Sequence, residues 1–178
     1  VDVDMSSKFP LVHFGAHRSP INNIQKFKLF LNDLSKLPGL KLIGIMGYEA
    51  QVAGVGDKNP FNPFLMNPII RLLKWRSIPE LAKRRQDVCQ LAAESGYPIK
   101  FVNGGGTGSI ESTIHDRSVT EITVGSGFYC PGLFDYFTGF RYRPAAGFAL
   151  EITRQWSSNI FTLAGGGYVA SGSIGLDK

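Results

Sequence analysis

The chain has 178 residues, which is long enough for one domain with a sizeable core or for an unequal pair of domains. Its content of 43% hydrophobic, 12% aromatic and 19% charged residues excludes a disordered tail, a coiled coil and a collagen-like rod. Lysine and arginine outnumber the acidic residues by 19 to 14, giving a net charge of +5. This excess is spread along the chain, so nucleic acid is not an expected partner.

The sequence also bears on the compartment of the protein. No apolar run approaches the roughly eighteen residues that a membrane span needs, and no signal peptide is recognised, so we expect no membrane partner. The two cysteines, Cys89 and Cys130, do not indicate a disulfide scaffold in a chain of this size, which favours a reduced cytoplasmic compartment. The chain opens in the middle of a strand-like alternation, and we expect it to be part of a longer protein.

Strands and helices are predicted to alternate over most of the chain. Short apolar or alternating runs predict strands at 1–5, 40–46, 98–102 and 119–124. Strands separated by helices favour parallel pairing with right-handed crossovers. Ligands bind at the carboxyl ends of the strands in such folds, and here each of these ends leads into a polar or glycine-rich segment.

Two helices have recognisable starts and stops. The first is predicted to begin at Ser19, whose hydroxyl can cap it, with a proline next at position 20. Its buried stripe is formed by Ile24, Phe27, Leu31 and Leu34. Residues 56–69 are rich in Asn, Pro and Gly and are predicted to form a long loop. Ser77 and Glu80 match a capping box that opens the second helix, which stops at Gly96.

The character of the sequence changes near residue 144. Residues 147–153 and 160–163 resemble antiparallel strands joined by a turn at 157–159. An eight-stranded α/β barrel usually takes about 250 residues, so four strands in the first part of this chain amount to half a barrel. We therefore predict an α/β fold with a partial (β/α) barrel at 1–143 and the beginning of a C-terminal β-domain at 144–178.

A glycine-rich loop is predicted after the third strand. Three consecutive glycines let the backbone turn with positive φ and approach a ligand closely, and hydroxyl groups and a helix start follow. The loop has neither the lysine of a phosphate-binding Walker loop nor the Rossmann glycine spacing, and a flexible connection remains the alternative. A second loop, Gly125-Ser126-Gly127, follows the next strand. Two such loops on neighbouring strands can hold one phosphate from two sides, so together they predict a phosphate site.

Other polar residues fall on the same expected rim. Glu49 could carry a proton, Tyr48 could stack on a planar ring, and Arg18 could pair with an acidic group of a ligand, although each could also be a plain loop residue. His115, Asp116 and the basic cluster 83–85 are interpreted as solvated surface. The spacing of histidine and cysteine predicts no metal site.

Five motifs in order carry a resemblance to a known family. They are Val1-Asp2-Val3-Asp4, His13-Phe14-Gly15 with Arg18-Ser19-Pro20, Met46 to Gln51, Asn103 to Ser109, and Thr123 to Tyr129. Together they resemble the alanine racemase N-terminal-domain superfamily, and most of all the amino acid deaminase/aldolase group that includes D-serine dehydratase and D-threonine aldolase. The similarity runs over nearly the whole chain.

The resemblance implies a fold-type III enzyme that uses pyridoxal 5′-phosphate, with an alanine racemase-type (β/α)8 barrel, a following β-domain and a homodimeric state. Arg18, Tyr48 and Glu49 match positions on the cofactor or substrate side, where the family places ring-contacting and proton-handling groups. The residues that the resemblance assigns to the cofactor are Asn103, Gly105, Gly106, Thr107, Gly108, Ser109, Thr123, Gly125, Ser126, Gly127 and Tyr129.

The sequence also departs from the family pattern. Thr123 falls near the position where racemases carry an arginine that faces the pyridine nitrogen. The family's Schiff-base lysine belongs to the first barrel strand, which we expect to precede this chain, and the zinc-bearing part of eukaryotic D-serine dehydratases would follow it. The chain then resembles the second half of the barrel, with binding determinants but without the covalent anchor.

The functional hypothesis is a lyase that acts on a small D-amino acid by deamination, dehydration or aldol cleavage once the whole protein is present. Racemisation remains open. The alternatives are a barrel enzyme that binds a sugar phosphate without an aldehyde cofactor, a non-catalytic pyridoxal-phosphate carrier, and an inert truncated chain.

Overall fold

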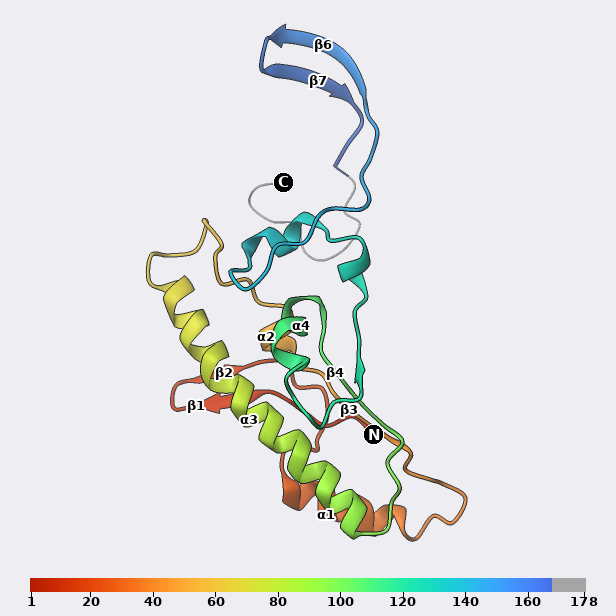
Figure 1. Ribbon diagram of the computed structural model, residues 1–178. Helices are drawn as coiled ribbons and strands as arrows, with labels where there is room; N and C mark the ends of the chain where they lie inside the picture. Colours follow the sequence, from red (N-terminus) through yellow and green to blue (C-terminus); the bar gives the residue numbers. More distant parts are fainter. Residues whose placement is uncertain (168–178) are drawn as a thin grey trace.

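The computed structural model describes residues 1–167, and its centre is a small parallel sheet (Figure 1). Three strands, β3 (Gly44–Gly47), β4 (Phe101–Gly104) and β5 (Glu121–Ile122), are neighbours in that order and run parallel. Asp2 forms a parallel bridge with Met46 at the free side of β3. The four segments therefore follow one another in chain order, which confirms the predicted parallel pairing.

The segment after Met5 is a β-hairpin, which the sequence analysis missed. Strands β1 (Ser7–Phe9) and β2 (Val12–Phe14) pair antiparallel around a two-residue turn, with Phe9 opposite Val12. Each strand has only three residues, which is too short for alternation to be recognised in the sequence.

Helix α1 (Ile24–Leu34) begins later than predicted. Asn23 is its cap, because the Asn23 side chain accepts a hydrogen bond of 2.9 Å from the Lys26 N–H. The Ser19 hydroxyl instead accepts from the Ile21 N–H at 3.1 Å and closes a local turn outside the helix. The predicted stripe is confirmed, with Phe27, Leu31 and Leu34 buried and Ile24 packed against the core.

Helix α3 (Met66–Glu94) is one continuous helix of 29 residues, so the predicted start at Ser77 is wrong. Ser77 is fully buried, and its hydroxyl donates to the Leu73 carbonyl one turn earlier at 2.8 Å. Pro79 lies inside the helix, where its missing N–H leaves the Trp75 carbonyl without the usual donor. The residues that this helix buries are Ile70, Lys74, Ser77, Leu81, Arg85, Val88 and Ala92.

The end of α3 agrees with the prediction of a stop at Gly96. This glycine has a φ of +83°. The Gly96 N–H donates to the Ala93 carbonyl and the Tyr97 N–H to the Ala92 carbonyl, both at 3.0 Å. This is the Schellman arrangement, which satisfies the last carbonyls of a helix and favours glycine at the left-handed position.

The main core lies where α1 and α3 cover the parallel sheet and the first residues of the chain. Its fully or almost fully buried members include Val3, Met5, Phe27, Ile45, Leu81, Val88 and Ala92. Short elements follow the carboxyl ends of the strands: α2 (Ala50–Ala53), η1 (Thr107–Ser109), α4 (Ile110–Thr113), η2 (Ser126–Phe128) and η3 (Gly132–Tyr136). A second, smaller core forms around η3 from Cys130, Phe134 and Phe137.

The C-terminal part confirms the predicted antiparallel pair, although its first strand lies four residues later than the predicted 147–153. Strands β6 (Glu151–Ser157) and β7 (Ile160–Ala164) form a hairpin that projects away from the sheet (Figure 1). Their side chains are exposed on both faces. Residues 168–178 of the predicted C-terminal domain lie outside the described residues. Among the described helices, none has both the length and the apolar character that crossing a bilayer requires.

Candidate functional site

The two predicted glycine loops lie side by side. The first follows β4 and leads into η1, and the second follows β5 and leads into η2. The Thr107 and Ser126 hydroxyl oxygens are 2.9 Å apart, within hydrogen-bonding distance. Behind them, the Asn103 amide and the Thr123 hydroxyl are joined at 2.6 Å. The parallel pairing of β4 with β5 brings these four side chains to one edge of the sheet.

Glycine is required in the first loop for two different reasons. Gly105 has a φ of +85°, which side-chain-bearing residues rarely adopt. Gly106 has an extended backbone, but a Cβ there would lie 2.8 Å from Cε2 of Tyr48 and 2.9 Å from Cβ of Ala53. The loop therefore packs tightly against Ala53 of α2 and against Tyr48.

Some polar groups of the loops are already used, and others are not. The Gly106 N–H donates to the Ser109 hydroxyl at 3.0 Å, so Ser109 supports the loop from inside. By contrast, the N–H groups of Thr107, Gly108, Ser126 and Gly127 donate to no acceptor within residues 1–167. Unpaired backbone N–H groups beside hydroxyls are the groups that bind phosphate oxygens in proteins. The edge of the sheet therefore offers a set of donors suited to an anion.

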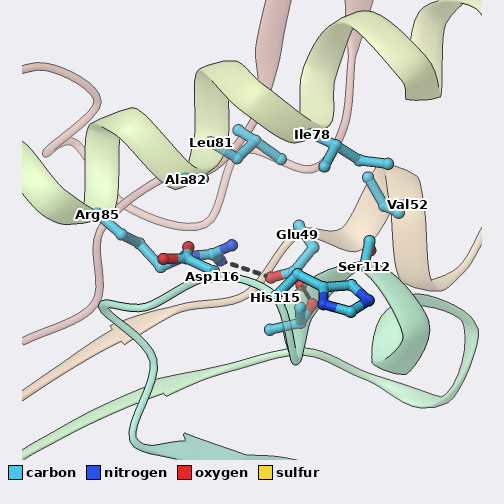
Figure 2. A pocket seen from close by; sticks show the side chains of 10 residues that line it. Glu49, Val52, Ile78, Leu81, Ala82, Arg85, Ser112, His115 and Asp116 are labelled. Carbon is cyan, nitrogen blue, oxygen red and sulfur yellow. Dashed lines mark hydrogen bonds and ion pairs between the residues drawn. The ribbon is translucent and has the colours of Figure 1, made fainter.

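Glu49 supports the first loop from behind. The residue is 2% exposed, and its Oε2 atom accepts from Nη1 of Arg85 at 2.9 Å and from the Gly105 N–H at 3.2 Å. The Thr113 hydroxyl donates to the other oxygen. Figure 2 shows the carboxylate directed toward Arg85. The carboxylate thus fixes the N–H of the one loop residue with positive φ, which is a positioning role.

Arg85 and Asp116 are corrections to the sequence analysis. Both were expected at the solvated surface, yet Arg85 is 3% and Asp116 7% exposed. Arg85 Nε donates to Asp116 at 2.7 Å, and its Nη1 also donates to the Gly47 carbonyl at 2.8 Å. The helical spacing of Arg85 with Leu81, Val88 and Ala92 already placed it on the buried stripe, and that signal could have identified it.

A small cavity of about 110 Å³ lies beside this ion-pair network, between α3 and α4 (Figure 2). Val52, Ile78 and Leu81 form its apolar side, and Glu49, Arg85 and Asp116 its polar side. The polar groups are paired with one another, so the cavity is a gap beside a structural network. Within the described part of the chain, no group of three His, Cys, Asp or Glu side chains could hold a metal ion.

Tyr48 lies next to the first loop, and Arg18 lies beside Tyr48. The Arg18 guanidinium carbon is 5.1 Å from the centre of the Tyr48 ring, and its Nη2 is 3.1 Å from the Asp2 carboxylate. Burial raises the pKa of Tyr48, the nearby Glu49 charge raises it further, and Arg18 opposes both. The Tyr48 hydroxyl therefore stays protonated at neutral pH. Since a Cβ at Gly106 would lie 2.8 Å from the Tyr48 ring, Tyr48 borders the first loop.

Tyr129 lies at the end of η2 and is 64% exposed. Its N–H donates to the Ser126 carbonyl at 3.1 Å, so it belongs to the second loop. Its carbonyl accepts from the Ala145 N–H at 3.0 Å, which connects this loop to the segment that leads to β6. The structure thus brings together Thr107, Ser126, Asn103 and Thr123, with Tyr48 beside Gly106.

Comparison of the chain with protein-family models and with curated protein sequences gives no match.

Proposed function

We propose that the two loops bind the phosphate of pyridoxal 5′-phosphate, in an enzyme that acts on a D-amino acid by deamination, dehydration or aldol cleavage. The observation that carries this proposal is the contact between the Thr107 and Ser126 hydroxyls. It means that donors from two successive strand ends can reach one dianion. The four unpaired N–H groups of the same loops fit a phosphate with several oxygens.

The order of the strands supports the proposed barrel. Residues 1–3 and strands β3, β4 and β5 follow one another in chain order and in parallel, as successive strands of an α/β barrel do. We propose that this sheet forms the second half of a barrel of the alanine racemase type. The hairpin β6–β7 would then open the C-terminal β-domain.

Each residue of the site has a task in this proposal. Thr107, Ser126 and the loop N–H groups hold the phosphate, and Glu49 with Arg85 keeps Gly105 in position. Tyr48 offers an aromatic face and a protonated hydroxyl at the edge of the loop, and Arg18 orients the Tyr48 ring and can attract a substrate carboxylate. When bound, pyridoxal phosphate supplies an electron sink for breaking a bond at the α-carbon of the amino acid.

Binding of the cofactor with and without its phosphate tests the proposal. We expect the chain to bind pyridoxal 5′-phosphate more tightly than pyridoxal in equilibrium dialysis. Ser126→Asp should weaken binding of the phosphate form by about tenfold or more, which is about 1.4 kcal/mol and within the range of repulsion between nearby charges. Pyridoxal binding should not change. Ser158→Asp, in the exposed turn of the hairpin, is the matched control. Equal binding of both compounds, or equal loss in both variants, would overturn the phosphate assignment.

A sugar phosphate is the second candidate ligand. Asn103 and Thr123 are neutral hydrogen-bonding groups next to the loops, and they suit sugar hydroxyls at least as well as a pyridine nitrogen. Competition separates the two proposals. A sugar phosphate that displaces inorganic phosphate while pyridoxal 5′-phosphate does not would favour the second candidate.

A further inference from the structure

A second cavity, of about 250 Å³, lies between α3 and residues 137–140. Trp75, Phe137 and Phe140 give it aromatic walls, and Asp57 and Lys74 give it charge. It reaches Gly108 in η1, but it includes neither Thr107 nor Ser126. Gly108, whose N–H is one of the proposed phosphate donors, is the residue that the cavity shares with the proposed phosphate site.

Lys74 is the unusual member of this cavity. It is 7% exposed, whereas the other lysines in the described part of the chain are exposed. Its Nζ atom lies 3.8 Å from Oδ2 of Asp57, which is longer than a hydrogen bond, and 4.3 Å from the centre of the Phe137 ring. Asp57 is the ion-pair partner of Lys74 within residues 1–167, and because this contact is long and Lys74 lines the cavity, its amine is available to a molecule there.

The Asp57 carboxylate is committed to other donors. Its Oδ1 atom accepts from the Thr138 N–H at 2.8 Å and from the Thr138 hydroxyl at 3.1 Å. Burial lowers the pKa of Lys74, and the Asp57 charge opposes this shift without cancelling it. Arg71 and Glu111 also line the cavity; Arg71 donates to the Asp57 carbonyl and Glu111 accepts from the Tyr142 hydroxyl.

We propose that Lys74 is a carbonyl-reactive amine and that this cavity takes a small aldehyde with an aromatic or apolar body. The Lys74 ammonium first loses a proton to solvent through the open cavity. The neutral amine then forms a C–N bond with the carbonyl carbon, the two amine protons and the carbonyl oxygen leave as water, and an imine remains. The aromatic side chains of the cavity hold the body of the aldehyde. This inference does not depend on the proposed function.

Reductive trapping tests the inference on the full chain. The probe is benzaldehyde with sodium cyanoborohydride, which reduces an imine to a stable secondary amine, followed by peptide mapping by mass spectrometry. At neutral pH we expect Lys74 to carry more of the adduct than any exposed lysine, because the aromatic side chains of the cavity hold the ring of benzaldehyde beside the Lys74 amine. Benzaldehyde has no phosphate, so failure of the phosphate assignment would leave the result unchanged.

Two variants sharpen the test. Lys74→Arg keeps the positive charge but cannot form an imine, and the main adduct should be lost. Lys83→Arg, at an exposed position of the same helix, should leave the adduct unchanged. Mapping of the unaltered chain decides the matter even if Lys74→Arg does not fold. Adduct spread over the exposed lysines, with Lys74 modified no more than they are, would overturn the proposal.

Discussion

Arg85 connects three segments that are far apart in the sequence. From α3 it reaches Glu49 after β3, Asp116 after α4, and the Gly47 carbonyl at the end of β3. Because Glu49 also accepts from the Gly105 N–H, a single guanidinium supports the first glycine loop. A buried charge with several partners is costly to remove, since its partners are left unpaired.

We therefore expect Arg85→Met to lower the free energy of unfolding by about 3–5 kcal/mol, because it leaves the Glu49 and Asp116 carboxylates buried without a cation. Urea denaturation followed by circular dichroism measures this change. Lys83→Met is the control, since Lys83 pairs with Asp87 at the surface and such pairs contribute about 1 kcal/mol or less. Similar losses in the two variants would contradict the role given to Arg85.

At the residue scale, the sequence predicted those site residues whose side-chain chemistry and position at the end of a strand point to the same role. Thr107 and Ser126 could be predicted as neighbours because parallel strands bring their carboxyl ends to one edge. Arg85 was missed because a charged residue on a helix is usually solvated, and Lys74 was missed because it precedes Ser77, where the helix was predicted to begin. The burial of both depends on partners distant in the sequence. Both lie on the buried stripe of α3, so the helical spacing of the apolar residues indicated their burial even though their charge did not.

Helix α3 shows which element boundaries a sequence specifies. Its end was predicted at the right residue, because Gly96 is the residue that a left-handed cap requires. Its start was misplaced, because serine and glutamate around a proline match a capping box as well as they match the middle of this helix. The hydrogen bond from Ser77 to the Leu73 carbonyl within the helix and the burial of Ser77 decide between the two, and the burial arises from tertiary packing.

The cap of α3 gives a prediction about backbone strain. Gly96→Ala should lower the free energy of unfolding by about 1–2 kcal/mol, because a Cβ is disfavoured in the left-handed region. A Cβ at Gly96 would meet no atom within 4 Å, so no steric clash contributes. Gly39→Ala is matched to it, because Gly39 also follows a helix, has open space, and lacks the positive φ. Thermal melting should show little change or a small gain for Gly39→Ala. Equal effects would argue against the strained cap.

At the scale of the whole molecule, the parallel sheet and the C-terminal hairpin differ in how they are covered. The sheet is packed against α1 and α3, whereas the apolar side chains of the hairpin face solvent, with Trp156 76% and Ile152 58% exposed. The strand-like sequence pattern predicted the antiparallel pair, but only the structure shows that both faces of the hairpin are exposed to solvent. An apolar hairpin of this kind invites pairing with another chain.

We expect the chain to self-associate through this hairpin. Trp156→Lys combined with Phe161→Lys should lower the sedimentation coefficient at high protein concentration, because two charges replace exposed apolar surface on β6 and β7. Leu11→Lys is the control, since Leu11 is 96% exposed in the turn between β1 and β2, on another part of the molecule. A chain that sediments as a monomer at every concentration, or a control that dissociates equally well, would contradict this expectation.

The proline inside α3 has a mechanical consequence. Lys74 and Arg85 lie about three turns apart on this helix, and Pro79 interrupts its hydrogen-bond ladder between them. Bending at this hinge is the least costly deformation of the helix. Such a bend would tilt the part of α3 that carries Lys74, while the part that carries Arg85 stays paired with Glu49 and Asp116. The cavity at Lys74 could then widen or narrow while Gly105 remains in place.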